Sequence, residues 1–243
     1  MLWLDSVLAV PAIGIRIDVK INEINRFQEN MIQFMDYLKN RYDVIEVKRK
    51  AVFGYAVNTP GPSFVLAPNN IVAEFEYNIE QKEISGDFPI IEKPELKLYS
   101  EILQMLSDDI HNLFGIFKNI KNITYDRIGI VAKTNLSKES IPPGILTWID
   151  YLGKPWGTKL LKSESTFFLR LLELDNYFNQ CHHLIKFDET LEDKGFDFKL
   201  DWQRAYKEKL IFNYDKIIFE LNSCISEAKD YFERFGAGEL SYE

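Results

Sequence analysis

The chain has 243 residues, with 29 Lys or Arg against 37 Asp or Glu, which gives a formal net charge of −8. Hydrophobic residues make up 46% of the sequence, a share that excludes a disordered, collagen-like or disulfide-scaffold protein. The acidic balance also argues against a generally basic nucleic-acid binder. We expect a single compact domain over residues 1–243, since this length can bury a core without metal or disulfide support.

The first half of the sequence alternates between two patterns. From Ile13 to Ile21 apolar residues alternate with polar ones, which is typical of a half-buried strand. Apolar residues then recur at helical spacing as far as Tyr42, which predicts an amphipathic helix. The same two patterns predict strands at 45–57 and 71–79, a helix from Pro94 to Phe117, and a strand at 123–134.

These elements read β-α-β-β-α-β, an order that predicts an α+β fold. We expect a mainly antiparallel sheet with helices packed on one face. The order also suits a ferredoxin-like unit, although strand order cannot be read from the sequence.

The second half is less regular. A short helix is predicted at 145–152, and the segment from Ser163 to Leu174 fits a helix or a strand. Alternation at 183–187 and 196–202 predicts a hairpin, and helical spacing predicts a long last helix at 214–235, with Gly236 just beyond it. A hairpin followed by a helix echoes the first half, so residues 1–134 and 135–243 are candidate pseudo-repeat halves.

The sequence lacks the common catalytic and phosphate-binding signatures. It has no glycine-rich phosphate loop, no nucleophile elbow and no Cys-x-x-Cys pair. The two cysteines, Cys181 and Cys224, are too few for a disulfide framework, so we expect a cytoplasmic protein. No apolar stretch reaches the roughly 20 residues that a membrane helix needs, so no membrane partner is expected.

The three histidines do not predict a metal site. His111 has no titratable partner at catalytic spacing except Asp108. His182 and His183 follow Cys181, but neighbours on a strand point to opposite faces and cannot share one site. We therefore predict no metal ligands among them and no cofactor.

One constellation carries an enzymatic hypothesis. Asp188 ends the first strand of the predicted hairpin, and Asp197 and Lys199 share a face of the second strand, with Asp188 roughly opposite Asp197. This spacing resembles the PD-(D/E)xK nuclease pattern, although Phe187 stands where that pattern has proline. The resemblance implies that the two carboxylates hold Mg²⁺ and that the lysine assists a water molecule.

A simpler interpretation explains the same residues. Phe196, Phe198, Leu200 and Trp202 would face the core, so the residues between them would form the solvated face of an amphipathic strand. Under that interpretation Asp197 and Lys199 have no catalytic role.

Aromatic residues are the remaining signal. The sequence has 18 Phe, 12 Tyr and 4 Trp, more rings than one core of this size obviously needs. Tyr and Trp favour interfaces, so Trp3, Trp148, Tyr151 and Trp156 are candidate binding residues. The alternative is that these rings cap the core.

Two main hypotheses follow. The first is a non-enzymatic protein, of inhibitor, immunity or accessory type, that acts through a protein partner or as a homo-oligomer; its acidic charge argues against nucleic acid as a partner. The second is a Mg²⁺-dependent nuclease or phosphoryl hydrolase that uses Asp188, Asp197 and Lys199. A small ligand bound between the sheet and the loops at 58–70 and 81–94 is a third alternative.

Overall fold

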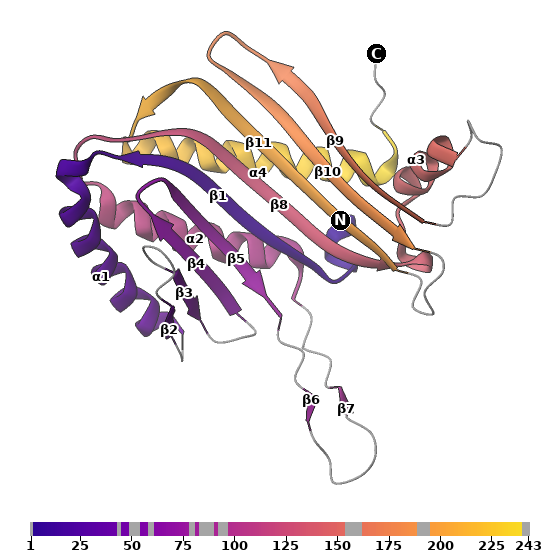
Figure 1. Cartoon of the computed structure of the whole chain (residues 1–243), viewed down its shortest axis with the longest axis horizontal. Coiled ribbons are helices and arrows are strands. Elements are labelled where there is room, and N and C mark those ends of the chain that lie inside the picture. The colour runs from indigo at the N-terminus through magenta and orange to yellow at the C-terminus, as the bar shows by residue number, and fades with distance from the viewer. Residues whose placement is uncertain are drawn as a thin grey trace.

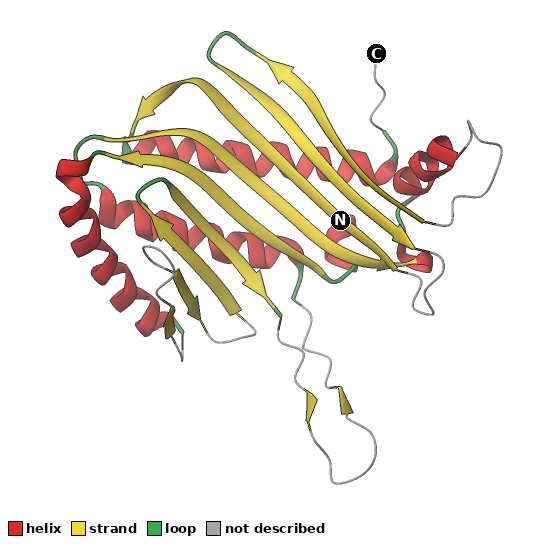
Figure 2. Cartoon of the chain, in the orientation of Figure 1, coloured by secondary structure: helices red, strands yellow, loops and turns green. Residues whose placement is uncertain are grey.

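The computed structural model describes residues 2–42, 45–48, 54–57, 61–77, 81–82, 90–91, 97–153, 162–188 and 195–239. Most of them build one broad antiparallel sheet with helices along one of its faces (Figures 1 and 2). The predicted α+β class is confirmed, as is the long C-terminal helix.

The helices are α1 (Ile24–Arg41), α2 (Tyr99–Phe117), α3 (Pro143–Gly153) and α4 (Tyr214–Ala237), and short 3-10 helices lie at Trp3–Ser6, Ile21–Glu23 and Lys138–Ser140. The strands of the large sheet are β1 (Ala9–Val19), β2 (Ile45–Lys48), β3 (Gly54–Val57), β4 (Gly61–Ala67), β5 (Asn70–Glu76), β8 (Ile123–Ser137), β9 (Lys162–Glu173), β10 (Tyr177–Asp188) and β11 (Gly195–Ile211). A separate ribbon pairs β6 (Gln81–Lys82) with β7 (Ile90–Ile91).

The strand order of the large sheet is β2-β3-β4-β5-β1-β8-β11-β10-β9, and every neighbouring pair is antiparallel. Within it, β5 lies between β1 and β4, and β1 lies between β5 and β8. This interleaving is the split arrangement of a ferredoxin-like unit, which the order of the first-half elements allows. The two longest-range pairings of the first half therefore meet at β1.

The core lies between the sheet and the helices. Alternation along β1 turns Ile13, Ile15 and Ile17 toward α2, and all three are buried. Helix α2 packs a continuous apolar stripe at helical spacing against them: Ile102, Leu103, Leu106, Ile110, Leu113 and Phe114. Behind β8 and β11, α4 buries its own stripe in the same layer (Figure 1).

Helix α2 begins at Tyr99, later than the predicted start at Pro94, which lies outside the described residues. A carboxylate from a distant part of the chain fixes this start. One Oδ of Asp5 accepts hydrogen bonds from the backbone N–H and the hydroxyl of Ser100, both at 2.8 Å. An acceptor at this position satisfies a backbone donor that the helix leaves free, and its charge suits the helix N-terminus.

The predicted strand at 45–57 is wrong as a single element. Ile45 lies opposite Val57, so the chain reverses between β2 and β3. The expected loop at 58–70 also overlaps a strand, because β4 begins at Gly61. Pro62 fits there because β3 pairs with β4 only from Ser63 onward, so its missing N–H removes no bond to β3.

The second half resolves two open points. The segment that fits either helix or strand is strand β9, and the predicted hairpin is confirmed as β10 and β11, both longer than expected. Helix α4 ends at Ala237, so the glycine just beyond it is Gly238, in the left-handed conformation (φ 76°), and not the expected Gly236. Gly236 instead lies inside the helix, where a Cβ would come within 2.2 Å of the Trp3 indole.

Candidate functional site

The large sheet has one face that no described helix covers. Figure 2 shows helices α2 and α4 behind the sheet and the strands in front. On the front face, alternate residues of the central strands project away from the core, and most of them are polar or charged. Pairing brings these residues into rows that run across β9, β10, β11, β8 and β1.

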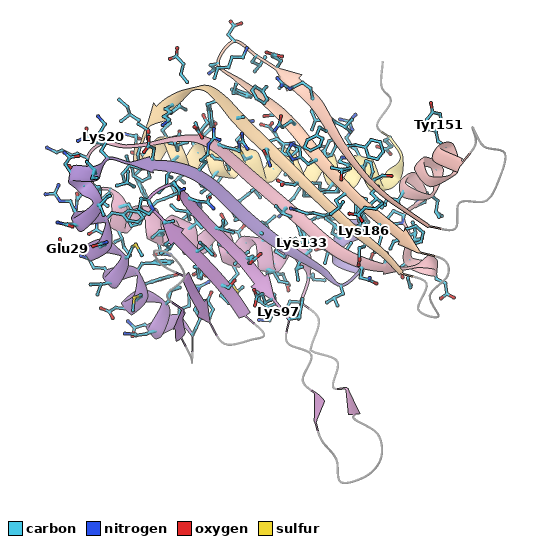
Figure 3. The ribbon with its side chains drawn as sticks, in the orientation of Figure 1. Lys20, Glu29, Lys97, Lys133, Tyr151 and Lys186 are labelled. Atoms are coloured by element: carbon cyan, nitrogen blue, oxygen red, sulfur yellow. The ribbon has the colours of Figure 1, made fainter. Side chains whose placement is uncertain are left out.

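Two of these rows contain directly opposed cations. Arg16 on β1 pairs with Arg127 on β8, and Lys133 on β8 pairs with Lys199 on β11. Like charges directly opposite each other destabilise a sheet. Lys133 and Lys186 both lie over the sheet on this face in Figure 3.

Three of the four cations have a carboxylate neighbour. Arg16 bonds to Asp126, Lys133 lies 3.3 Å from Glu74, and Lys199 lies 3.7 Å from Asp201. The fourth cation, Arg127, forms no ion pair within the described part of the chain, and its Nε is buried without a hydrogen-bond partner there. The face is therefore mixed in charge, and the guanidinium at its centre has no ion-pair partner within the ranges that the structure describes.

Two glycines lie between the opposed cations. Gly14 of β1 pairs with Gly129 of β8, and both side-chain positions face the uncovered side. A Cβ added at Gly14 would meet no atom within 4 Å, and one at Gly129 would come no closer than 3.6 Å to its neighbours. Neither residue has a positive φ. Packing and backbone geometry therefore require glycine at neither position, although glycine weakens a strand interior.

The glycines form the floor of a depression of about 540 Å³. Its walls include Arg127, Gln203 and Asn70. A second depression, of about 710 Å³, lies over the neighbouring part of the face. Lys133, Lys199 and Glu74 line both, so the two depressions are continuous along the sheet.

Beside the glycine floor, two side-chain amides and a histidine form a hydrogen-bonded chain. Gln203 donates to Asp201 at 2.9 Å, and Gln180 donates to Gln203 at 3.2 Å. The amide nitrogen of Gln180 also lies 3.2 Å from Nε2 of His182. Burial lowers the pKa of His182 against the opposing effect of Asp201, and the charges of Arg127 and Lys199 lower it further. A neutral imidazole is the expected form at pH 7.

The predicted catalytic residues Asp188 and Asp197 do not lie opposite each other in the sheet. Asp197 lies opposite Lys186, not opposite Asp188, which pairs with Lys162 on β9. The Asp188 side chain lies outside the described residues. Asp197 accepts a hydrogen bond from Asn135 at 2.8 Å. No group of three or more His, Cys, Asp or Glu side chains that could hold a metal ion occurs within the described ranges.

The predicted aromatic binding residues do not gather on this face. The indole N–H of Trp3 donates to the carbonyl of Phe232 at 2.8 Å, so this ring attaches the N-terminal segment to α4. Tyr151 projects from α3 and is 72% exposed (Figure 3). The Trp148 side chain and Trp156 lie outside the described residues.

The two cysteines and His183 face the core. Both cysteines are free and buried, and burial raises the pKa of the Cys181 and Cys224 thiols. His183 lies 2.8 Å from the hydroxyl of Tyr231, and burial lowers its pKa to about 4. These groups are uncharged at neutral pH and lie on the helix side of the sheet. Among the described residues no helix is long and apolar enough to cross a bilayer.

Sequence reasoning identifies only Lys199 and Asp197 among the residues of this face. Alternation places Gly14 and Arg16 on the outer side of the first strand, but it gives no reason to join them to Arg127 and Gly129, which lie far away in the sequence. The strand pairing carries that information, and no local pattern in the sequence encodes it.

No family model matches the chain, and no curated protein matches it. Among solved structures, one match is a rolling circle replication initiator protein from Geobacillus stearothermophilus, with 9% sequence identity and a TM-score of 0.28. The match covers 90% of this chain and 80% of that one. At this TM-score it does not establish a common fold, and the proposals below rest on the sheet face.

This match nevertheless stands against two expectations drawn from the composition. The matching structure is that of a replication initiator, so the expectation of a non-enzymatic protein that acts through a protein partner or self-association is contradicted, and so is the argument against nucleic acid as a partner. The physical reason lies in how charge is distributed. The net charge of −8 is a sum over the whole chain, whereas on this sheet face cations such as Arg127 and Lys133 lie among carboxylates such as Glu74 and Asp201.

Proposed function

We propose that this chain binds nucleic acid on the uncovered face of its sheet. The observation that carries the proposal is the pair of opposed cations Arg16 and Arg127, together with the second pair, Lys133 and Lys199. Opposed like charges cost folding free energy, so a sequence that keeps two such pairs on one open face gains something other than stability. A phosphate backbone lying across the face would neutralise both pairs.

The glycine floor supports the same assignment. A glycine in a central strand often marks a place where a ligand approaches the backbone closely. Gly14 and Gly129 are adjacent, have room for a side chain, and lie between the two cation pairs. A flat group of the ligand can therefore lie directly on the sheet while phosphates reach the cations on either side.

The mixed charge of the face limits the number of phosphate contacts. Four cations in two pairs allow about four phosphates, and for a single strand each phosphate contributes roughly −0.7 to the slope of log affinity against log salt. We expect a slope of about −3 between about 50 and 200 mM salt, measured by fluorescence anisotropy with a labelled single-stranded oligonucleotide. A slope near zero, or no binding at micromolar protein, would contradict the proposal.

A glycine variant separates binding from folding. Gly14→Val should raise the free energy of unfolding by about 0.5–1 kcal/mol, because a β-branched residue suits a strand better than glycine. The same variant should weaken oligonucleotide binding by about tenfold, because the side chain occupies the floor. Thermal melts and anisotropy titrations give the two readouts.

Gly115→Ala is the matched control. Gly115 lies inside α2 on the helix side, and an added Cβ would approach nothing closer than 3.8 Å. It should stabilise the protein by a similar amount and leave binding unchanged. If both glycine variants stabilise the protein and neither weakens binding, the floor is not part of the site.

Hydrolysis of the bound strand stays a prediction. The nuclease hypothesis assigns Asp188 and Asp197 to Mg²⁺ and Lys199 to the water molecule, and Lys199 also lines the proposed binding face. A cytoplasmic location likewise stays a prediction, which the two free, buried cysteines support.

A further inference from the structure

An exposed aromatic ring lies at the edge of the same face. Phe168 of β9 is 70% exposed, although burying a phenylalanine side chain is one of the larger gains in folding. Its neighbour Phe167 points to the other side of the strand, as alternation requires. The ring centroid of Phe168 lies 4.3 Å from that of His182, at an interplanar angle of 63°.

Strand pairing connects this ring to the glycine floor. Phe168 lies opposite His182, His182 opposite Asp201, and Asp201 opposite Val131. Val131 lines the depression above Gly129. Three strand spacings of about 4.8 Å separate Phe168 from β8, or roughly 14 Å. A single strand of two or three extended nucleotides covers that distance.

The groups between the two ends can bond to base edges. Gln180, Gln203 and His182 present amide and imidazole nitrogens and an amide oxygen along this path. Bases splayed from a single strand are held by stacking on aromatic rings and by hydrogen bonds to their edges. Bases inside a duplex offer no free ring face at such a position.

We propose that Phe168, supported by His182, is a stacking platform for one unpaired base of a single-stranded nucleic acid. The inference rests on the proposed function, because the cations Arg127, Lys133 and Lys199 hold the phosphates of the same strand. Charge complementarity favours this occupant, since the ring lies beside a face where the opposed lysines, and Arg127 without an ion pair among the described residues, attract a polyanion. The ligand then runs across the strands rather than along them.

The test compares two phenylalanines of equal exposure. Phe219 is also 70% exposed but belongs to α4, on the other side of the sheet. Phe168→Ala should weaken binding of a single-stranded oligonucleotide by about tenfold, within the range expected for one stacked base, and Phe219→Ala should not. Phe168→Trp should retain binding. The salt slope of Phe168→Ala should equal that of the unmodified protein, because the phosphate contacts persist.

The outcomes separate the two proposals. If the unmodified protein binds no oligonucleotide, the proposed function fails. If it binds but Phe168→Ala and Phe219→Ala change the affinity alike, only the stacking platform fails. The same holds if Phe168→Ala weakens binding of a duplex of the same sequence as much as binding of the single strand. Sedimentation velocity covers one more case: a dimer that Phe168→Ala dissociates would assign the ring to a second copy of the chain and overturn the inference.

Discussion

Replacing Arg204 with leucine is expected to lower the free energy of unfolding by about 3 kcal/mol, the scale found when one partner of a buried ion pair is removed. The Arg204 side chain is 3% exposed between β11 and α4. Its Nη1 lies 3.0 Å from Glu220, its Nη2 bonds to Glu227, and its Nε donates to Asn179 at 3.2 Å. The leucine leaves the carboxylates of Glu220 and Glu227 without their cation beside the core, although Tyr206 and Ser223 still donate to them.

The carboxylates of this network depend on the arginine. Burial alone would raise the pKa of Glu227, but the hydrogen bonds from Arg204 and Ser223 hold it below its ordinary value. Without Arg204 that pKa should rise. Chemical denaturation monitored by circular dichroism gives the stability. Arg170→Leu is the control, because Arg170 is 48% exposed, forms a surface ion pair with Glu173 and lies over the ring of Phe178. Equal losses in the free energy of unfolding for the two variants would contradict a stabilising role for the Arg204 network.

Reversing two charges on the sheet face is expected to weaken nucleic-acid binding by about 100-fold. The variant combines Arg127→Glu with Lys133→Glu, one residue from each opposed pair. The protein should fold with nearly unchanged stability, since each new carboxylate faces a cation across the strands, although the one at 133 also lies beside Glu74. Anisotropy titration measures the affinity, and thermal melting measures the stability.

A control of equal charge change lies on the opposite side. Lys216→Glu with Lys229→Glu makes the protein more negative by the same amount but places the changes on α4. If the α4 variant loses as much affinity as the sheet-face variant, overall charge governs binding and the face does not. A large loss confined to the sheet face supports the proposed interface.

The elements with clean periodicity are the ones that sequence reasoning predicts well. Strand β1, helix α1, the β10–β11 hairpin and helix α4 follow from alternation or helical spacing, because each buries one face against a single layer. Strand β4 does not follow, since Gly61 and Pro62 suggest a turn unless the short reach of β3 is known. The start of α2 does not follow either, because Asp5 lies far from it in the sequence.

The candidate site was harder to predict than the fold for a related reason. A residue such as Arg127 is ordinary in its own strand, and it becomes informative only when its partner across the ladder is Arg16. Gly129 is equally ordinary until Gly14 is placed beside it. The aromatic excess pointed to Trp and Tyr residues, whereas the exposed ring on the face is Phe168, whose strand could also be interpreted as a helix.

The strand order has one further consequence. Outward from β1 the sheet continues through β5, β4 and β3, and outward from β8 it continues through β11, β10 and β9, with a helix after each central strand. The expected halves, 1–134 and 135–243, place β1 and most of β8 in the same half. We propose instead that the repeat boundary precedes β8, so that the two halves so divided meet between β1 and β8. The opposed arginines and the glycine floor then straddle this seam. A polyanion bound there would relieve repulsion across the seam, so ligand binding and the docking of the halves would be thermodynamically linked.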